Sequence, residues 1–301
     1  MEAWKGKDIN MKYEVIEIKI AQSVQANLTL YIQEQYPEVY GDRKRPMALI
    51  CPGGGYGHVS PREGEAIALH FLTAGCHAAV LRYDVAGHGV EFPQHLLELA
   101  ASVSYIREHA KELTVIPDQI LVGGFSAGGH LAACLGCFWH EEWLEKLMKK
   151  ELGVTKESYQ PNGLILGYPV ITSGEFAHRG SFENLMRKKA QEGCECIGLS
   201  GSELEAKLSL ENQVTDNVPP VFMWHTFEDG AVPLENSLFF AMALRKAGVS
   251  LEYHVFPRGG HGYALGTKET AIVTTMKEID PQIPQWMELC KNWIKYTYIE
   301  K

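Results

Sequence analysis

Two patterns of hydrophobic and polar residues alternate along this chain. Residues 13–20 and 28–32 alternate polar and apolar side chains with a period of two, which predicts a half-exposed antiparallel pair of strands. Residues 46–51 form a short apolar run, as expected of a buried strand. Further strands are predicted at residues 77–83, 119–125, 163–168, 221–225 and 251–256.

Stretches with apolar residues at three- to four-residue spacing separate these strands. Helices are predicted at residues 96–113, 127–138, 234–247 and 286–294. The alternation of strands and helices predicts an α/β fold with a mostly parallel central sheet flanked by helices. We expect residues 1–301 to form a single domain.

One polar segment interrupts this alternation. Residues 172–217 lie between two predicted strands and contain short helix-like pieces such as residues 182–191. Long connections of this kind within a compact domain are typically functional. The segment is therefore predicted to be an insertion that forms a small lid.

A glycine-rich segment and a helix start follow the first buried strand. Residues 52–56 read Pro-Gly-Gly-Gly-Tyr, which is too rich in glycine for regular structure. Ser60, Pro61 and Glu63 then occupy the positions of a helix cap, a first helical residue and the acid of a capping box. They predict one capped helix over residues 61–74.

The composition is that of an ordinary soluble globular enzyme, with 46% hydrophobic and 22% charged residues among 301. The formal net charge of −9 argues against a nucleic-acid partner, because phosphate backbones are bound by clustered lysine and arginine. No stretch approaches the roughly 18–20 apolar residues that a membrane-spanning helix needs. The first eight residues also lack the apolar run of a secretory signal. We therefore expect a cytoplasmic protein with no membrane partner.

Seven cysteines are scattered along the chain, and their odd number and spacing are typical of reduced thiols. Cys134 and Cys137 form a C-x-x-C pattern, but they lie in an apolar helix where small buried residues are expected. We interpret this pair as packing residues. No metal site is predicted.

The strongest chemical motif is Gly124-Phe125-Ser126-Ala127-Gly128, a G-x-S-x-G sequence. A predicted apolar strand precedes the motif, and a predicted helix follows it at once. The two flanking glycines lack a Cβ atom, so the chain can turn sharply and present the serine hydroxyl at the edge of the sheet. This context favours Ser126 as a nucleophile over an incidental serine in a glycine-rich turn.

A serine nucleophile needs a base and an acid that follow it along the chain. His261 lies in a glycine-rich loop after the last predicted strand, where the base is expected. Asp229 follows a strand and precedes a helix that opens with Val-Pro, so we predict it to be the acid that orients His261. Glu228 is adjacent and stays a rival. Asp216 precedes the strand and is therefore expected at the wrong end of the sheet.

Three other histidines are weaker candidates for the base. His88 precedes the serine, and His225 lies within or at the end of the strand before the acid, so neither matches the expected position of the base. His130 lies one helical turn after Ser126. We expect it to pack on that helix.

Acyl transfer also requires hydrogen-bond donors for the oxyanion of the tetrahedral intermediate. The backbone N–H of Ala127 is one candidate, because it follows the nucleophile at the start of a helix. Gly54 and Gly55 are candidates for the second donor, because a glycine loop lets the backbone approach a substrate closely. A phosphate-binding loop is disfavoured, since neither Lys-Ser/Thr nor G-x-G-x-x-G fits this segment. Nearby residues expected either to line the substrate pocket or to have structural roles are Tyr56, His58 and Arg62.

Five segments together carry a family resemblance: Cys-Pro-Gly-Gly-Gly-Tyr, Arg-Glu-Gly-Glu, Gly-Phe-Ser-Ala-Gly-Gly-His, Trp-His-Thr-x-x-Asp-x-x-Val-Pro and Gly-Gly-His-Gly. The chain resembles, over nearly its whole length, the acetyl-xylan-esterase-like branch of the esterase/lipase α/β hydrolases. The resemblance implies the α/β-hydrolase fold, deacetylation of sugars or related small esters without a cofactor, and the triad Ser126, Asp229 and His261. Pro52 is a departure, because hormone-sensitive-lipase-like enzymes carry the histidine of H-G-G-G there.

The residues leave three functions open. The expected one is a serine esterase that acts on a small-molecule ester with a small acyl group, above all acetyl. An amide hydrolase similar to an arylformamidase or a peptidase would use the same triad, although no repeats indicate the propeller of prolyl-oligopeptidase-type enzymes. A catalytically inactive ligand-binding relative is the least expected. Homo-oligomerisation stays open.

Overall fold

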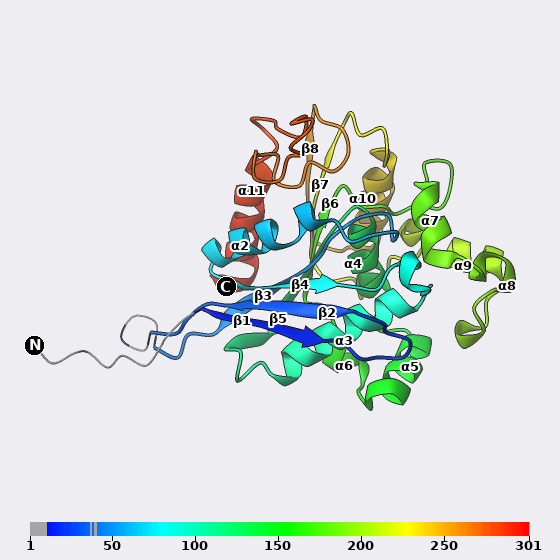
Figure 1. Cartoon of the computed structure of the whole chain (residues 1–301), viewed down its shortest axis with the longest axis horizontal. Helices are drawn as coiled ribbons and strands as arrows, with labels where there is room; N and C mark the ends of the chain where they lie inside the picture. Colours follow the sequence, from blue (N-terminus) through cyan, green and yellow to red (C-terminus); the bar gives the residue numbers. More distant parts are fainter. Residues whose placement is uncertain (1–10, 37, 39–40, 301) are drawn as a thin grey trace, which may run out of the picture.

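The computed structural model describes residues 11–36, 38 and 41–300. Within this part of the chain, eight strands form one sheet in the order β1-β2-β4-β3-β5-β6-β7-β8 (Figure 1). The first eight residues, for which no secretory signal was expected, lie outside the described residues. The strands are β1 (Lys12–Glu17), β2 (Asn27–Ile32), β3 (Arg45–Cys51), β4 (His77–Arg82), β5 (Val115–Phe125), β6 (Gly163–Gly167), β7 (Val221–Thr226) and β8 (Leu251–Phe256).

The sheet is mostly parallel. Strand β2 pairs antiparallel with both β1 and β4, and every other pair of neighbours is parallel. Edge strand β1 alternates exposed and partly buried residues, whereas all seven residues of the central strand β3 are buried. The predicted antiparallel edge pair and buried central strands are therefore confirmed, since the apolar pattern follows how many faces of each strand are covered.

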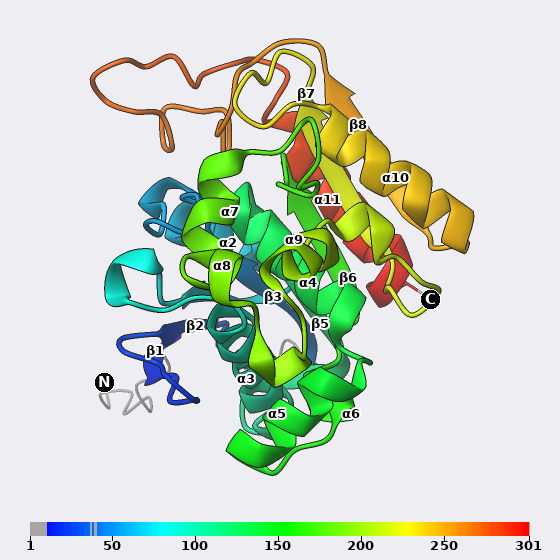
Figure 2. The ribbon, with the colours of Figure 1, turned by 90° about the vertical axis from the view of Figure 1, so that its right-hand side faces the viewer.

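Helices cover both faces of the sheet (Figures 1 and 2). On one face, α2 (Glu65–Thr73) and α11 (Gln285–Ile294) share a core in which the rings of Trp224 and Trp286 stack with centroids 5.3 Å apart. The other core contains the apolar sides of α3 (Gln94–Glu108), α4 (Ala127–Phe138) and α10 (Glu235–Ala247). Each large apolar side chain buried in these layers contributes about 1.5–3 kcal/mol to folding. Two further helices, α5 (Glu142–Leu152) and α6 (Lys156–Tyr159), lie in the chain between α4 and β6.

The predicted insertion lies between β6 and β7 and is mostly helical. Its buried residues Leu204, Leu208 and Leu210 belong to the same core as helix α4. The end of this segment is joined to the chain that follows β6, because the N–H of Leu210 donates to the carbonyl of Ile171 at 3.0 Å. Figure 2 shows its helices in front of the central sheet. The elements are α7 (Arg179–Met186), α8 (Lys189–Glu192), η3 (Glu195–Ile197), α9 (Gly201–Lys207) and η4 (Leu210–Asn212).

The predicted capped helix over residues 61–74 is wrong in its first turn. The chain forms a short 3₁₀ helix, η1 (Pro61–Glu63), and α2 begins only after Gly64. Ser60 makes no capping hydrogen bond with its side chain. The carboxylate of Glu63 is instead buried and accepts a hydrogen bond from the N–H of Gly53 at 2.8 Å. A distant backbone donor therefore replaces the local partner that the capping box predicts.

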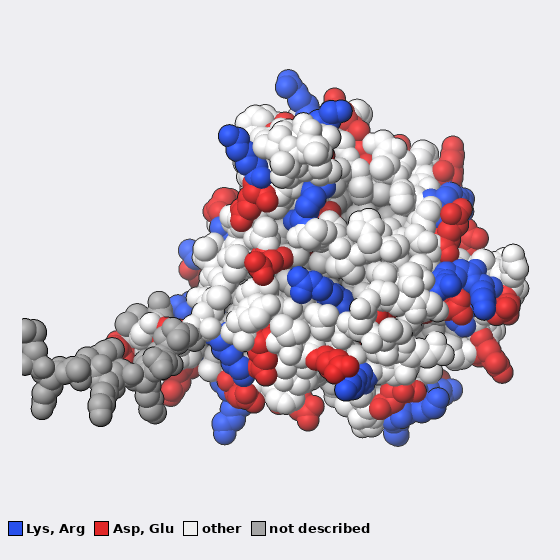
Figure 3. Space-filling view, in the orientation of Figure 1, with Lys and Arg blue, Asp and Glu red and all other residues white. Residues whose placement is uncertain are grey.

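Acidic and basic side chains are interspersed over the face shown in Figure 3. Among the described residues, none of the helices combines the length and apolar character required to cross a membrane.

Candidate active site

Ser126 lies at a sharp turn between β5 and α4. Its backbone has φ 54° and ψ −121°, a conformation that non-glycine residues rarely adopt. A Cβ atom on Gly124 would approach the carbonyl oxygen of Gly128 to 2.0 Å, and one on Gly128 would approach the carbonyl oxygen of Cys51 to 2.1 Å. Both glycines of the motif are thus required by close backbone contacts, and the strained turn places Ser126, which is only 6% exposed, at the wall of a cleft.

The structure brings Ser126, His261 and Asp229 into one hydrogen-bonded line. His261 Nε2 lies 2.8 Å from Ser126 Oγ, and His261 Nδ1 lies 2.7 Å from Asp229 Oδ2. The two partners of the histidine therefore lie on opposite ring nitrogens. This geometry allows the imidazole to accept the serine proton while the carboxylate fixes its tautomer.

Asp229 is buried but well supplied with donors. The N–H groups of Ala231 and Val232 donate to Oδ1 at 3.0 and 2.9 Å. Burial opposes ionisation, yet the hydrogen bonds from His225 and His261 and from the backbone outweigh it and hold the pKa of Asp229 well below its usual range. The hydrogen bonds therefore favour the anionic form of Asp229.

The two rival acids lie elsewhere. Glu228 Oε2 accepts a hydrogen bond from the N–H of Gly259 at 3.1 Å rather than contacting His261. Asp216 precedes β7, whereas Asp229 follows it, so the two acids belong to opposite ends of this strand. The geometry therefore selects Asp229 as the partner of His261.

His225 is a member of this site that the sequence did not single out. It lies at the end of β7, and its Nε2–H lies 3.2 Å from Asp229 Oδ2 and 3.0 Å from the carbonyl oxygen of Val232. Its Nδ1 contacts the hydroxyl of Ser237. In the sequence, only its position four residues before Asp229 indicates that the two residues could meet. The structure shows the contact between its buried ring and the carboxylate of Asp229.

The glycine loop lies beside Ser126. Gly54 and Gly55 have φ values of +122° and +61°, and both line the same cleft as Ser126. A Cβ on Gly54 would meet the carbonyl oxygen of His58 at 2.1 Å, so this position admits no side chain. Ala127 begins α4 directly after Ser126, as predicted. The three backbone N–H groups predicted to form an oxyanion hole thus belong to the segments next to Ser126.

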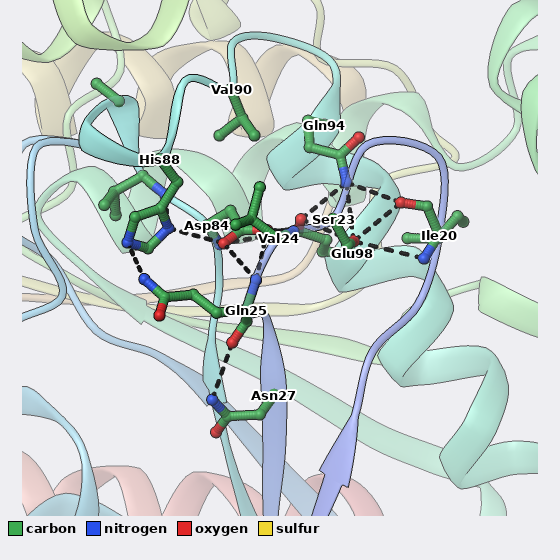
Figure 4. Close-up of polar contacts among 12 residues, drawn as sticks. Ile20, Ser23, Val24, Gln25, Asn27, Asp84, His88, Val90, Gln94 and Glu98 are labelled. Atoms are coloured by element: carbon green, nitrogen blue, oxygen red, sulfur yellow. Dashed lines mark hydrogen bonds and ion pairs between the residues drawn. The ribbon is translucent and has the colours of Figure 1, made fainter.

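Polar residues in the segment after β4 hold the glycine loop by hydrogen bonds. The hydroxyl of Tyr83 donates to the carbonyl of Pro52 at 2.7 Å, and the N–H of Ala86 donates to the carbonyl of Tyr56 at 2.9 Å. Asp84 lies between Tyr83 and Ala86 in the sequence. Its carboxylate contacts His88 and backbone N–H groups of the β1–β2 connection (Figure 4). These contacts anchor the segment after β4 against the loop.

The cleft above Ser126 has a volume of about 400 Å³, and polar residues dominate its lining. The insertion contributes one wall, where the side chain of Asn184 donates to the carbonyl of Gly55 at 2.9 Å. His178, also from the insertion, has its pKa lowered by burial and by the nearby His261. The lining residues are Gly54, Gly55, His58, Ser60, Arg62, Glu63, Ser126, His178, Gly180, Asn184, His261 and Gly262.

The three residues expected near the pocket differ in their positions. His58 is exposed and lines the cleft. Arg62 also lines it, but its guanidinium donates to the backbone carbonyls of Gly262 and Thr270 at 2.6 and 2.5 Å. Tyr56 is buried, and its hydroxyl lies 2.9 Å from Nδ1 of His130, so its predicted structural role fits and its contact with substrate does not.

Comparisons with known proteins agree with this geometry. The chain matches the BD-FAE family over residues 34–244, more than half of its length. It is 35% identical over 231 residues to endo-1,4-beta-xylanase B of Butyrivibrio fibrisolvens, which covers 76% of this chain and 34% of that protein. The chain spans between 34% and 53% of the length of the curated relatives it matches.

Two solved structures cover the chain almost completely. The acetyl ester-xyloside bifunctional hydrolase from Caldicellulosiruptor lactoaceticus is 33% identical with a TM-score of 0.71, over 91% of this chain and 89% of that one. The carboxylesterase Cest-2923 from Lactobacillus plantarum WCFS1 is 26% identical with a TM-score of 0.78, over 96% and 98%. The chain therefore belongs to the BD-FAE family, within the α/β-hydrolase esterases.

Proposed function

We propose that this protein is a serine esterase that removes acetyl groups from sugars of the xylan type. The observation that carries the reaction class is the line of hydrogen bonds from Ser126 through His261 to Asp229. Support for an acetylated sugar comes from the solved acetyl ester-xyloside hydrolase and from the related xylanase B. A cytoplasmic location stays a prediction from the sequence.

The proposed reaction is acyl transfer in two steps. His261 takes the proton of Ser126 as the hydroxyl attacks the ester carbonyl, and the N–H groups of Ala127 and of Gly54 or Gly55 stabilise the oxyanion. His261 then gives its proton to the leaving alcohol. Water attacks the acyl-serine by the same route and releases the acid.

The lining of the cleft supports a short acyl group. Every residue that lines the cleft beside Ser126 is polar or a glycine. Such a cleft offers no apolar side chain against which a long acyl chain could be buried, whereas an acetyl group has little apolar surface to bury.

The test uses Ser126→Ala and a series of p-nitrophenyl esters. The variant should lose turnover of p-nitrophenyl acetate by about 10⁴-fold or more, because the nucleophile is removed. For the wild type, kcat/KM should fall at least about tenfold from acetate to octanoate. Release of acetate from acetylated xylo-oligosaccharides would support the sugar substrate.

Three outcomes would contradict the proposal. Unchanged turnover in Ser126→Ala would exclude the proposed nucleophile. A preference for octanoate would exclude the short-acyl assignment. Faster release of formate from N-formylkynurenine than of acetate from any acetyl ester would favour the amide hydrolase instead.

A further inference from the structure

Glu63 is a buried carboxylate with an unusual set of partners. It is only 4% exposed, and no described basic side chain forms an ion pair with it. Its Oε2 accepts the N–H of Gly53 at 2.8 Å, and its Oε1 accepts the hydroxyl of Tyr168 at 2.7 Å. Burying an acid is costly unless its hydrogen bonds compensate, so these two contacts are what keep the side chain in place.

Tyr168 continues this connection on the other side. It is buried directly after β6, and its hydroxyl accepts the N–H of Ala264 at 3.0 Å. Burial and the nearby Glu63 raise the pKa of Tyr168 well above its usual value. The hydroxyl therefore keeps its proton and donates a hydrogen bond to Glu63. The ring of Tyr168 also packs edge-on against the imidazole of His261, with centroids 5.1 Å apart.

The ends of this connection lie in the two loops that the reaction uses. Gly53 directly precedes the oxyanion candidates Gly54 and Gly55, and Ala264 lies three residues after His261. The hydrogen bond between Gly53 and Glu63 joins residues ten apart in the sequence. The hydrogen bond between Glu63 and Tyr168 joins residues 105 apart. One hydrogen-bonded path therefore joins the oxyanion loop to the histidine loop without passing through Ser126.

The backbone at the histidine end needs such support. Tyr168 and Ala264 have φ values of +36° and +52°, in the left-handed region that non-glycine residues occupy at an energetic cost. Conformations of this kind persist only where their surroundings fix them. The hydroxyl of Tyr168, itself one of the strained residues, accepts the backbone N–H of the other, Ala264.

From these contacts we propose that Glu63 and Tyr168 form a positioning pair, which sets the oxyanion donors in register with His261. The inference rests on the proposed function, since it concerns the same reaction. Neither residue exchanges a proton with the substrate. They act by fixing two loops, so their loss misplaces groups that act in the transition state and leaves ground-state binding largely intact.

The first test is Tyr168→Phe, which removes one oxygen atom and keeps the ring against His261. The kcat for p-nitrophenyl acetate should fall about 10- to 100-fold, as expected of a misplacement below 1 Å, with KM changed less than about threefold. Rates are normalised to active sites counted by complete labelling of Ser126 with an organophosphate. This normalisation separates a lower kcat from a smaller folded fraction.

The matched control is Tyr159→Phe. Tyr159 is also a fully buried tyrosine, and its hydroxyl has no hydrogen-bond partner among the described residues. It lies in α6, outside the cleft. Its kcat per titrated site should stay within about twofold of the wild type. An equal loss in both variants would overturn the proposal, because it would reflect a general effect of altering a buried tyrosine.

A double-mutant cycle provides the second readout. Glu63→Gln keeps the size of the side chain and one acceptor, and should lower kcat less than Glu63→Ala does. If the pair acts through one connection, Tyr168→Phe should cost clearly less in the Glu63→Gln background than in the wild type. If the losses of kcat in the two single variants multiply in the double variant, the two residues act independently and the proposal is wrong. A lower melting temperature with unchanged kcat per titrated site would show that the pair has a structural role only.

These outcomes are distinct from a failure of the proposed function. A wild-type protein that does not turn over acetylated xylo-oligosaccharides but hydrolyses p-nitrophenyl acetate would remove the sugar assignment and leave this test intact. If only Glu63→Gln or only Tyr168→Phe can be purified in a folded form, kcat per titrated site of that single variant decides the question.

Discussion

Two buried acidic clusters in this protein are built alike and behave differently. Asp229 follows β7 and contacts His225, four residues before it, while Asp84 follows β4 and contacts His88, four residues after it. Each acid also accepts two backbone N–H groups. Asp229 has a second imidazole, His261, as its remaining partner. Around Asp84, the corresponding neighbour is a second carboxyl group.

That second carboxyl group belongs to Glu98. It accepts the N–H of Asp84 at 2.8 Å and the side chains of Ser23 and Gln94 at 3.0 and 2.8 Å (Figure 4). Burial, above all, raises the pKa of Glu98 to about 8, whereas backbone donors hold the pKa of Asp84 low despite burial. The three acids differ in the balance of these effects: hydrogen-bond donors outweigh burial at Asp229 and Asp84, whereas burial outweighs the donors at Glu98.

The largest effect is expected where the acid orients a base. Asp229→Asn should lower kcat/KM for p-nitrophenyl acetate by about 10⁴-fold, because the amide neither fixes the tautomer of His261 nor stabilises its cation. The isosteric control in the other cluster is Glu98→Gln, which should change kcat/KM less than about twofold. Equal losses in both variants would remove the distinction between the clusters.

A smaller effect is expected from the second imidazole. His225→Gln removes a hydrogen bond to the charged Asp229, so kcat/KM should fall about tenfold at neutral pH. The loss of this donor also raises the pKa of Asp229 toward its usual range. Loss of kcat/KM through protonation of Asp229 should therefore begin at a higher pH in the variant than in the wild type. If neither the rate nor the profile changes, His225 only fills space.

The third effect concerns stability rather than rate and belongs to the scaffold cluster. The folded pKa of Glu98, about 8, exceeds the value of 4.5 expected of an ordinary glutamate. The folded state thus binds an extra proton, and the stability from this group is complete below pH 4.5 and is lost as the pH rises through 8. Glu98→Gln should remove that dependence, which amounts to a few kcal/mol at most, about 1.4 per pH unit.

Urea denaturation at pH 6 and pH 9 measures this difference. The wild type should lose more unfolding free energy between these values than Glu98→Gln does, with equal m-values for both proteins. The same pH dependence in both proteins would show that Glu98 does not carry the buried proton. In that case the two clusters would differ in catalysis alone.

Much of the site followed from short-range patterns. The strand, the G-x-S-x-G turn and helix α4 are contiguous in sequence, so Ser126 could be placed from its neighbours alone. The order of Asp229 and His261 after parallel strands predicted that they meet at one edge of the sheet, and the structure places both in contact as expected. Helix α4 was predicted to the residue because its apolar pattern is strong.

Long-range contacts were the part that the sequence did not show. Glu63 matched a capping box, yet its carboxylate contacts Tyr168, which is 105 residues away. Tyr56 follows the glycines of the oxyanion loop but is buried against His130. His225 was set aside as a base and proved to contact Asp229. In each case the residue type and its position were known, while its partner depended on which strands lie side by side.

By itself, the sequence determined the α/β architecture, the nucleophile turn and the order of the triad. These features depend on backbone geometry and on the period of apolar residues, which are local properties. Only the tertiary structure decided which acid contacts His261, that Glu63 contacts Tyr168, and which residues of the insertion line the cleft. A buried polar group takes the partner that folding brings within about 3 Å, and that choice is made by the packing of distant segments.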